Sequence, residues 1–86
     1  MVAEKVIIKN ETGLHARPAS NLVKEASAYP CTLRIRKGDK EVNLQSMLGV
    51  LSLGVAKGDE VTIIADGPDE EESLKKIIEF INCLER

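Results

Sequence analysis

The residues best suited to chemistry lie in one stretch, Gly13-Leu14-His15-Ala16-Arg17-Pro18-Ala19-Ser20, which contains the only histidine of the 86-residue chain. A neutral imidazole has an unshared electron pair on one ring nitrogen, so it can accept a phosphoryl group and pass it to a second acceptor. On its own, a single histidine fits an ordinary surface or core position equally well. The residues around His15 therefore decide between the two interpretations.

A helix is predicted to begin directly after His15, because apolar residues recur there at intervals of three and four: Ala16, Ala19, Leu22, Val23 and Ala26. Pro18 fits only the first turn of a helix, which places His15 at or near the N-cap. The N–H groups of Ala16 and Arg17 then lack helical partners, and together with the helix dipole they attract anions. The guanidinium of Arg17 also matches phosphate oxygens. The stretch thus predicts a phosphate-binding site around a nucleophile.

Ser46 is a second candidate site, because it precedes a short apolar segment that fits one brief helix. A serine hydroxyl at an N-cap accepts a hydrogen bond from the first turn, and this role alone would explain Ser46. A phosphoserine at the same place would be stabilised by the free N–H groups and would add nearly two negative charges to the surface. The two interpretations are compatible.

Three large apolar residues follow that serine: Met47, Leu48 and Leu51. A short helix beside glycines cannot easily bury all of them, so we expect some to form an exposed patch near the loop of His15. Exposed apolar patches often bind partners, and methionine suits a surface that meets several of them. The alternative is that these residues cap the core.

Both stretches resemble signatures of one protein family. The segment 13–19 is similar to the active-site signature of the HPr family, the histidine-containing phosphocarriers of the bacterial phosphoenolpyruvate-dependent sugar phosphotransferase system. The segment 46–54 is similar to the regulatory-serine segment of that family, and its distance from His15 also agrees. The resemblance covers essentially the whole chain.

The resemblance implies a phosphoryl carrier rather than an enzyme, with no cofactor. His15 would accept a phosphoryl group from enzyme I, on the ring nitrogen nearer the backbone, and pass it to sugar-specific enzyme IIA domains. Arg17 would assist, and the backbone of Ala16 and Arg17 would bind the phosphate. The expected partner-binding residues are Ser20, Met47, Leu48 and Leu51.

The resemblance also implies that Ser46 is a regulatory phosphorylation site for a kinase of the HPr kinase/phosphorylase type. Gln45 stands where the Gram-positive branch of the family commonly has lysine. Two alternatives keep the fold: a regulatory binding module that acts through phospho-Ser46, and a nitrogen-type phosphotransferase carrier. Regulatory relatives lose the histidine, whereas this chain retains His15, which favours the carrier.

Composition excludes several classes of function. The net charge is −2, and the only aromatic residues are Tyr29 and Phe80. Non-specific nucleic-acid binding needs a basic surface and base-stacking aromatics, so no nucleic-acid partner is expected. The N-terminus has no signal-peptide layout, and no apolar run reaches membrane-spanning length. We therefore expect a cytoplasmic protein with no membrane insertion. We also expect a monomer.

Two further pairs of residues have ordinary explanations. Cys31 and Cys83 are expected to be small buried apolar residues, because no other cysteine and no nearby histidine completes a metal site. Arg34 and Arg36 alternate with Leu33 and Ile35, which predicts a strand with one wet face rather than an anion site.

The remaining pattern predicts one domain, residues 1–86, of the α+β class. Strands are expected over 2–9, 31–37, 40–44 and 60–65, with a loop over 10–13 and helices over 16–28 and directly after Ser46. A last helix is expected to be capped by Asp69 with Glu72 as capping-box partner, and to carry one apolar stripe: Leu74, Ile77, Ile78, Ile81 and Leu84. The family resemblance implies a two-layer open-faced β-sandwich, in which three helices cover one face of a four-stranded antiparallel sheet of order 1-4-2-3.

Overall fold

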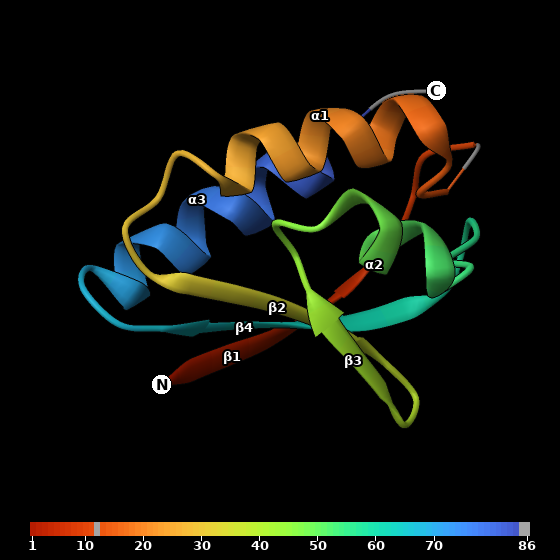
Figure 1. The fold of residues 1–86 in the computed structure, drawn as a ribbon. Coiled ribbons are helices and arrows are strands. Elements are labelled where there is room, and N and C mark those ends of the chain that lie inside the picture. Colours follow the sequence, from red (N-terminus) through yellow and green to blue (C-terminus); the bar gives the residue numbers. More distant parts are fainter. Residues whose placement is uncertain (12, 85–86) are drawn as a thin grey trace.

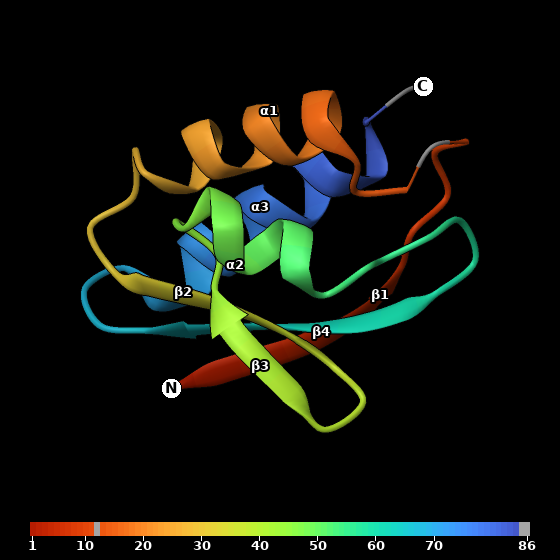
Figure 2. The same cartoon turned by 45° about the vertical axis from the view of Figure 1, so that its right-hand side comes forward.

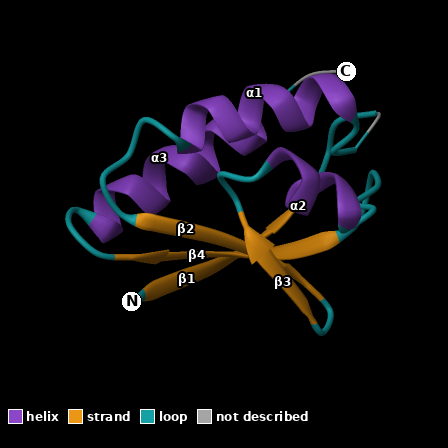
Figure 3. Cartoon of the chain, in the orientation of Figure 1, coloured by secondary structure: helices purple, strands orange, loops and turns teal. Residues whose placement is uncertain are grey.

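A computed structural model describes residues 1–11 and 13–84, so Thr12 of the predicted loop and the last two residues lie outside the described part. The elements follow one another in this order: β1 (Val2–Ile7), α1 (Ala16–Ala26), β2 (Thr32–Lys37), β3 (Lys40–Asn43), α2 (Met47–Ser52), β4 (Glu60–Asp66) and α3 (Glu70–Asn82). The strands form one antiparallel sheet of order β1-β4-β2-β3. All three helices lie on the same face of this sheet (Figure 1; Figure 3). The expected fold class and strand order are confirmed.

The core is aliphatic and lies between the sheet and the helices. Alternate residues of β2 and β4 point toward the helices and are almost fully buried: Leu33, Ile35, Val61, Ile63 and Ala65. The helices cover them with Leu22 of α1, Val50 of α2 and Ile77 of α3, which are also fully buried. Each large aliphatic side chain contributes roughly 1.5–3 kcal/mol by leaving water. This packing fixes the helices, and thereby the start of each helix, relative to the sheet.

The first helix is shorter than expected. It ends at Ala26 rather than at residue 28, because the next N–H groups form tighter turns: Ala28 donates to the carbonyl of Glu25 and Tyr29 to that of Ala26. The side chain of Gln45 also donates to the Ala26 carbonyl, at 2.9 Å. The end of α1 is therefore tied to the connection between β3 and α2.

Asp69 is the N-cap residue of α3, as expected, but the expected side-chain capping and capping box are wrong. Its carbonyl accepts the Ser73 N–H at 2.9 Å, but its backbone is left-handed, with φ 56° and ψ 32°, rather than extended as at a typical N-cap. Among the described residues its side chain accepts no capping hydrogen bond. Glu72, the expected capping-box partner, instead pairs with Lys76 at 3.4 Å.

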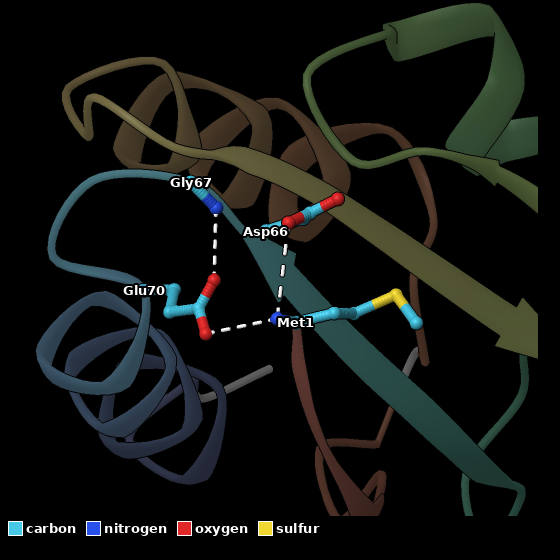
Figure 4. A network of polar contacts seen from close by, with 4 residues as sticks. All are labelled: Met1, Asp66, Gly67 and Glu70. Carbon is cyan, nitrogen blue, oxygen red and sulfur yellow. Dashed lines mark hydrogen bonds and ion pairs between the residues drawn. The ribbon is translucent and has the colours of Figure 1, made fainter.

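Glu70 stabilises the start of α3 instead (Figure 4). One carboxylate oxygen accepts the Gly67 N–H at 2.9 Å, and the other accepts from the N-terminal ammonium of Met1 at 2.9 Å. The Gly67 hydrogen bond, followed by the ammonium, lowers the pKa of Glu70. The first residue of the chain is thus joined to the turn between β4 and α3.

The two cysteines differ from each other. Cys31 is buried, as expected, but Cys83 is exposed. The expectation for Cys83 is wrong because α3 ends at Asn82, so Cys83 lies at the C-cap outside the apolar stripe.

Arg34 and Arg36 are exposed on the open face of the sheet, where Arg34 pairs with Glu41 at 2.7 Å. Within the described residues, no helix is both long enough and apolar enough to cross a membrane.

Candidate functional site

His15 is the N-cap of α1, as the sequence predicts. Its backbone is extended, with φ −80° and ψ −168°, and its carbonyl accepts the Ala19 N–H at 2.8 Å, the first hydrogen bond of the helix. Pro18 lies buried in the first turn. The imidazole is exposed, and within the described residues it forms no capping hydrogen bond. The ring is therefore free to react while the backbone of the same residue starts the helix.

The loop before His15 rests closely on the backbone of residues 55 and 56. Gly13 has φ 62°, and a Cβ at this position would lie 2.5 Å from the carbonyl oxygen of Val55 and 2.7 Å from the Cα of Ala56. The Leu14 N–H donates to that same Val55 carbonyl at 3.0 Å. Only glycine combines this backbone conformation with so close an approach. The support under His15 is thus backbone packed against backbone.

Asn10 closes the other side of the loop. Its side chain is almost fully buried and its amide donates to the Gly13 carbonyl, while the Gly13 N–H donates to the Asn10 carbonyl at 3.1 Å. Leu14 anchors the loop in the core, with 2% of its surface exposed. His15 is therefore presented by a loop that is held at both ends.

A shallow depression of about 230 Å³ adjoins the histidine. It is lined by His15 and its neighbours, by α2 and by the segment after α2: Leu14, His15, Ala16, Leu51, Gly54, Val55 and Ala56. Ala16 and Arg17 lie exposed in the first turn of α1, where N–H groups have no helical partner. An anion on His15 would face these donors and the positive end of the helix dipole.

The exposed apolar patch expected beside this site is present in part. Leu48 is 81% exposed and Leu51 is 39% exposed, whereas Met47 is half-buried against the core. The helix that carries them lies beside α1 (Figure 2), and the exposed Ser20 lies on α1. The structure therefore places Leu51 beside the histidine and the start of α1, and Leu48 is exposed on the same short helix.

Ser46 is the N-cap of α2, as expected. Its backbone is extended, and its hydroxyl oxygen accepts the Gly49 N–H at 3.2 Å. The residue before it has a structural role: the Gln45 side chain binds the Ala26 carbonyl, and the Gln45 N–H donates to the side chain of Asn43 at 2.8 Å. Gln45, the residue before Ser46, is thus held by two hydrogen bonds.

Comparison with known proteins decides the family. Residues 2–82 match the family described as the PTS HPr component phosphorylation site. This chain belongs to the HPr family of phosphocarriers. The resemblance seen in the sequence is therefore confirmed.

Relatives in the HPr family match along nearly the whole chain. The HPr-like protein Crh of Bacillus subtilis (strain 168) is 43% identical over 81 residues, which cover 94% of this chain and 95% of Crh. The crystal structure of HPr-C-His from Thermoanaerobacter tengcongensis matches with a TM-score of 0.92 at 43% identity, over 95% of this chain and 92% of that chain. A crystal structure of an HPr dimer from the same organism matches with a TM-score of 0.75 at 44% identity, over 90% and 88% of the two chains.

Sequence reasoning missed the residues that support the HPr signature from elsewhere in the chain. The carbonyl of Val55 accepts the Leu14 N–H, and the side chain of Asp59 accepts the Ala56 N–H. Both residues belong to the connection between α2 and β4, for which no contact with the His15 segment was predicted. Gly13 is the one signal that could have pointed to a close backbone neighbour. Its type gives no indication of which distant segment that neighbour belongs to.

Proposed function

We propose that this protein is a phosphocarrier in which His15 accepts a phosphoryl group from phospho-enzyme I and passes it to sugar-specific enzyme IIA domains. The observation that carries the proposal is the exposed imidazole at the start of α1, next to backbone N–H groups that no helical carbonyl occupies. Family membership supports phosphoryl carriage as the chemistry.

The transfer consists of two displacements at phosphorus. In the first, the ring nitrogen of His15 nearer the backbone, Nδ1, forms a bond to phosphorus while the bond to the donor on enzyme I breaks. In the second, the acceptor on enzyme IIA attacks the phosphorus and the bond to His15 breaks, which returns the electron pair to the imidazole. Both steps depend on positioning and on charge stabilisation more than on further side-chain chemistry.

The residues that follow the histidine supply that stabilisation. The N–H groups of Ala16 and Arg17 are the nearest free donors of the helix, and the guanidinium of Arg17 extends from the same exposed turn. Charge-assisted bonds to phosphate oxygens are stronger than neutral ones, so Arg17 would favour the phosphorylated state and the transition state. The donor and acceptor proteins provide the remaining groups.

The surface around His15 is the proposed docking surface for enzyme I and enzyme IIA. Leu48 and Leu51 provide exposed apolar area, Met47 lies half-buried next to them, and Ser20 lies on the adjacent helix. An apolar centre flanked by polar residues suits partners that must bind and leave repeatedly. We expect the working form to be a monomer. The HPr of Thermoanaerobacter tengcongensis has a crystal structure as a dimer, so the oligomeric state of this protein should be measured in solution.

Phosphorylation of Ser46 is the proposed means of regulation, by a kinase of the HPr kinase/phosphorylase type. A phosphate on this residue would lie at the start of α2, beside the exposed leucines, and would add nearly two negative charges to the docking surface. Gln45 next to it is uncharged and its side chain is bound to the Ala26 carbonyl. The added charge would therefore not be neutralised by the preceding residue.

The test is phosphorylation in vitro. The protein would be incubated with phosphoenolpyruvate and enzyme I, its intact mass recorded, and the site mapped at alkaline pH, which preserves phosphohistidine. We expect one phosphoryl group on His15 in the wild type and none in His15→Ala, which should fold normally because the exposed ring contributes little packing. An unmodified wild type beside a functioning reference HPr would overturn the proposal.

A regulatory module that acts through phospho-Ser46 is the second candidate. The 43% identity to Crh, an HPr-like protein, favours it. It predicts that His15→Ala retains the binding of a regulatory partner to the Ser46-phosphorylated form. A nitrogen-type phosphotransferase carrier would use the same histidine chemistry with different partners. The enzyme I that phosphorylates the protein would therefore distinguish this carrier type from the sugar-type carrier.

A further inference from the structure

The loop of residues 54–59, between α2 and β4, supports both sides of the connection that leads to His15. At its start, the Val55 carbonyl accepts the Leu14 N–H at 3.0 Å. At its end, the Asp59 carbonyl accepts the Ile8 N–H at 2.9 Å, and the Gly58 N–H donates to the Ile8 carbonyl at 2.7 Å. A shift of this loop would therefore move the chain on each side of the loop at 10–13.

One ammonium group binds this loop at two points. The Nζ of Lys37, at the end of β2, lies 2.9 Å from a carboxylate oxygen of Asp59 and donates to the carbonyl of Gly54 at 3.0 Å. The same oxygen of Asp59 accepts the Ala56 N–H at 2.9 Å. The Ala56 hydrogen bond, followed by Lys37, lowers the pKa of Asp59. The carboxylate thus joins the lysine to the backbone directly after Val55.

This ion pair differs from its neighbour on the same loop. The side chains of Lys37 and Asp59 are 35% and 32% exposed, whereas those of the adjacent pair, Lys57 and Glu11, are 55% and 76% exposed. An exposed pair of single charges has little effect on structure. A half-covered pair that also binds two backbone groups restricts the loop more, because three bonds must break together for the loop to move.

We infer that Lys37 and Asp59 are positioning residues for His15: their pairing fixes the 54–56 backbone on which the Leu14–His15 segment rests. Neither residue touches the reacting atoms. The inference deepens the proposed function and rests on it, because the position that is fixed is that of the proposed phosphoryl acceptor. Through Lys37 at the end of β2, the β2–β3 hairpin would thus help to position His15.

The test compares Lys37→Met, which keeps the apolar stem and removes the charge, with Lys37→Arg, which keeps a donor cation. The matched control is Arg34→Met, which breaks the Arg34–Glu41 pair on the same strand; within the described residues this is the one ion pair of Arg34, and it does not involve the 54–59 loop. Two quantities are measured: hydrogen exchange of the Leu14 amide, and the kcat and KM for phosphorylation by enzyme I.

We expect Lys37→Met to speed exchange at Leu14 roughly tenfold, while exchange in the sheet stays unchanged. Because a displaced acceptor lowers the rate of the chemical step more than it weakens docking, kcat should fall roughly three- to tenfold with KM nearly constant. Lys37→Arg should restore both values, and Arg34→Met should change neither. Asp59→Asn should loosen the loop in the same way as Lys37→Met.

Three results would overturn the inference. One is unchanged exchange at Leu14 in both Lys37→Met and Asp59→Asn. Another is faster exchange throughout the protein, which would mean a general loss of stability. The third is a changed KM with unchanged kcat. The exchange measurement needs no phosphoryl transfer, so failure of wild-type phosphorylation would refute the proposed function without deciding whether the pair holds the loop.

Discussion

The starts of α1 and α2 share the same N-cap backbone conformation but differ in whether the N-cap side chain accepts a hydrogen bond. Each begins after a residue with extended backbone whose carbonyl accepts the first helical hydrogen bond, His15 in α1 and Ser46 in α2. In α2 the serine hydroxyl accepts the Gly49 N–H. In α1 the imidazole forms no such bond among the described residues. The N-cap side chain of α2 thus satisfies one of the free N–H groups of its helix, whereas that of α1 satisfies none.

The difference shows how a small domain can carry an anion without a dedicated pocket. A capping side chain stabilises a helix by about 1 kcal/mol, and α1 forgoes that stabilisation by having histidine at its N-cap. The free donors then face the atom that would carry phosphate. The loop under α1 provides stability in another way, through Gly13, Leu14 and the Val55 carbonyl.

The largest expected effect comes from making the two helix starts alike. His15→Ser would give α1 a capping hydroxyl like that of α2. Phosphoryl acceptance from enzyme I should be lost completely, while the free energy of unfolding should rise by about 0.5–1 kcal/mol because an orphan N–H gains a partner. Intact mass after incubation and urea denaturation measure the two quantities. Lower stability in His15→Ser would contradict the view that the start of α1 is uncapped.

The next effect tests the support under α1. Gly13→Ala should lower the free energy of unfolding by about 2 kcal/mol or more, because alanine is strained at φ 62° and its Cβ would meet the Val55 carbonyl. Gly38→Ala is the matched control, since Gly38 has φ 61° and nothing within 4 Å of an added Cβ. The difference between the two variants, measured by urea denaturation, isolates the contact. Equal destabilisation would show that this contact contributes nothing.

Arg17→Ala tests the cation at the free helix start. We expect phosphoryl transfer from enzyme I to slow roughly tenfold with the unfolding midpoint unchanged, because Arg17 is exposed and, in the proposed mechanism, would stabilise charge that develops at phosphorus. Lys24→Ala, in the last turn of the same helix, is a control that removes a charge away from the site. Rapid-quench kinetics measure both. Identical rates in wild type and Arg17→Ala would remove Arg17 from the site.

Ser46→Ala and Ser46→Asp separate the two roles of the other helix start. Ser46→Ala should lower the free energy of unfolding by about 1 kcal/mol through loss of the cap, and leave binding to enzyme I unchanged. Ser46→Asp should keep the cap and weaken that binding, because its charge would lie on the proposed docking surface. Calorimetric titration with enzyme I measures the second effect. Equal affinity in the two variants would mean that the serine acts only as a cap.

Local patterns in the sequence were sufficient to predict both helix starts. The apolar spacing after His15 and the first-turn proline fix the N-cap, and Ser46 before an apolar run fixes the other. Strand alternation likewise places Leu33 inside and Arg34 outside. These features depend on residues within one turn or one strand, so neighbours in the sequence decide them.

The features that sequence reasoning missed depend on distant residues or on backbone angles. Asp69 is the N-cap of α3, but with its left-handed backbone its side chain makes no capping hydrogen bond, and Glu70 binds the Met1 ammonium and the Gly67 N–H. The Lys37–Asp59 pair and the Gln45–Ala26 hydrogen bond join segments that meet only in the folded chain. The periodicity of a sequence does not indicate which of its many charged or amide side chains will contact each other in the folded chain.

NMR of the single histidine ring would show whether the uncapped start of α1 holds the phosphoryl acceptor. Uniformly ¹⁵N-labelled protein would be followed through long-range ¹H–¹⁵N correlations while phosphoenolpyruvate and enzyme I are added. We expect the Nδ1 signal of His15 to shift to that of a phosphorylated nitrogen and the amide signals of Ala16 and Arg17 to shift with it. Phosphorylation seen by mass with unchanged ring signals would place the group elsewhere and contradict the account.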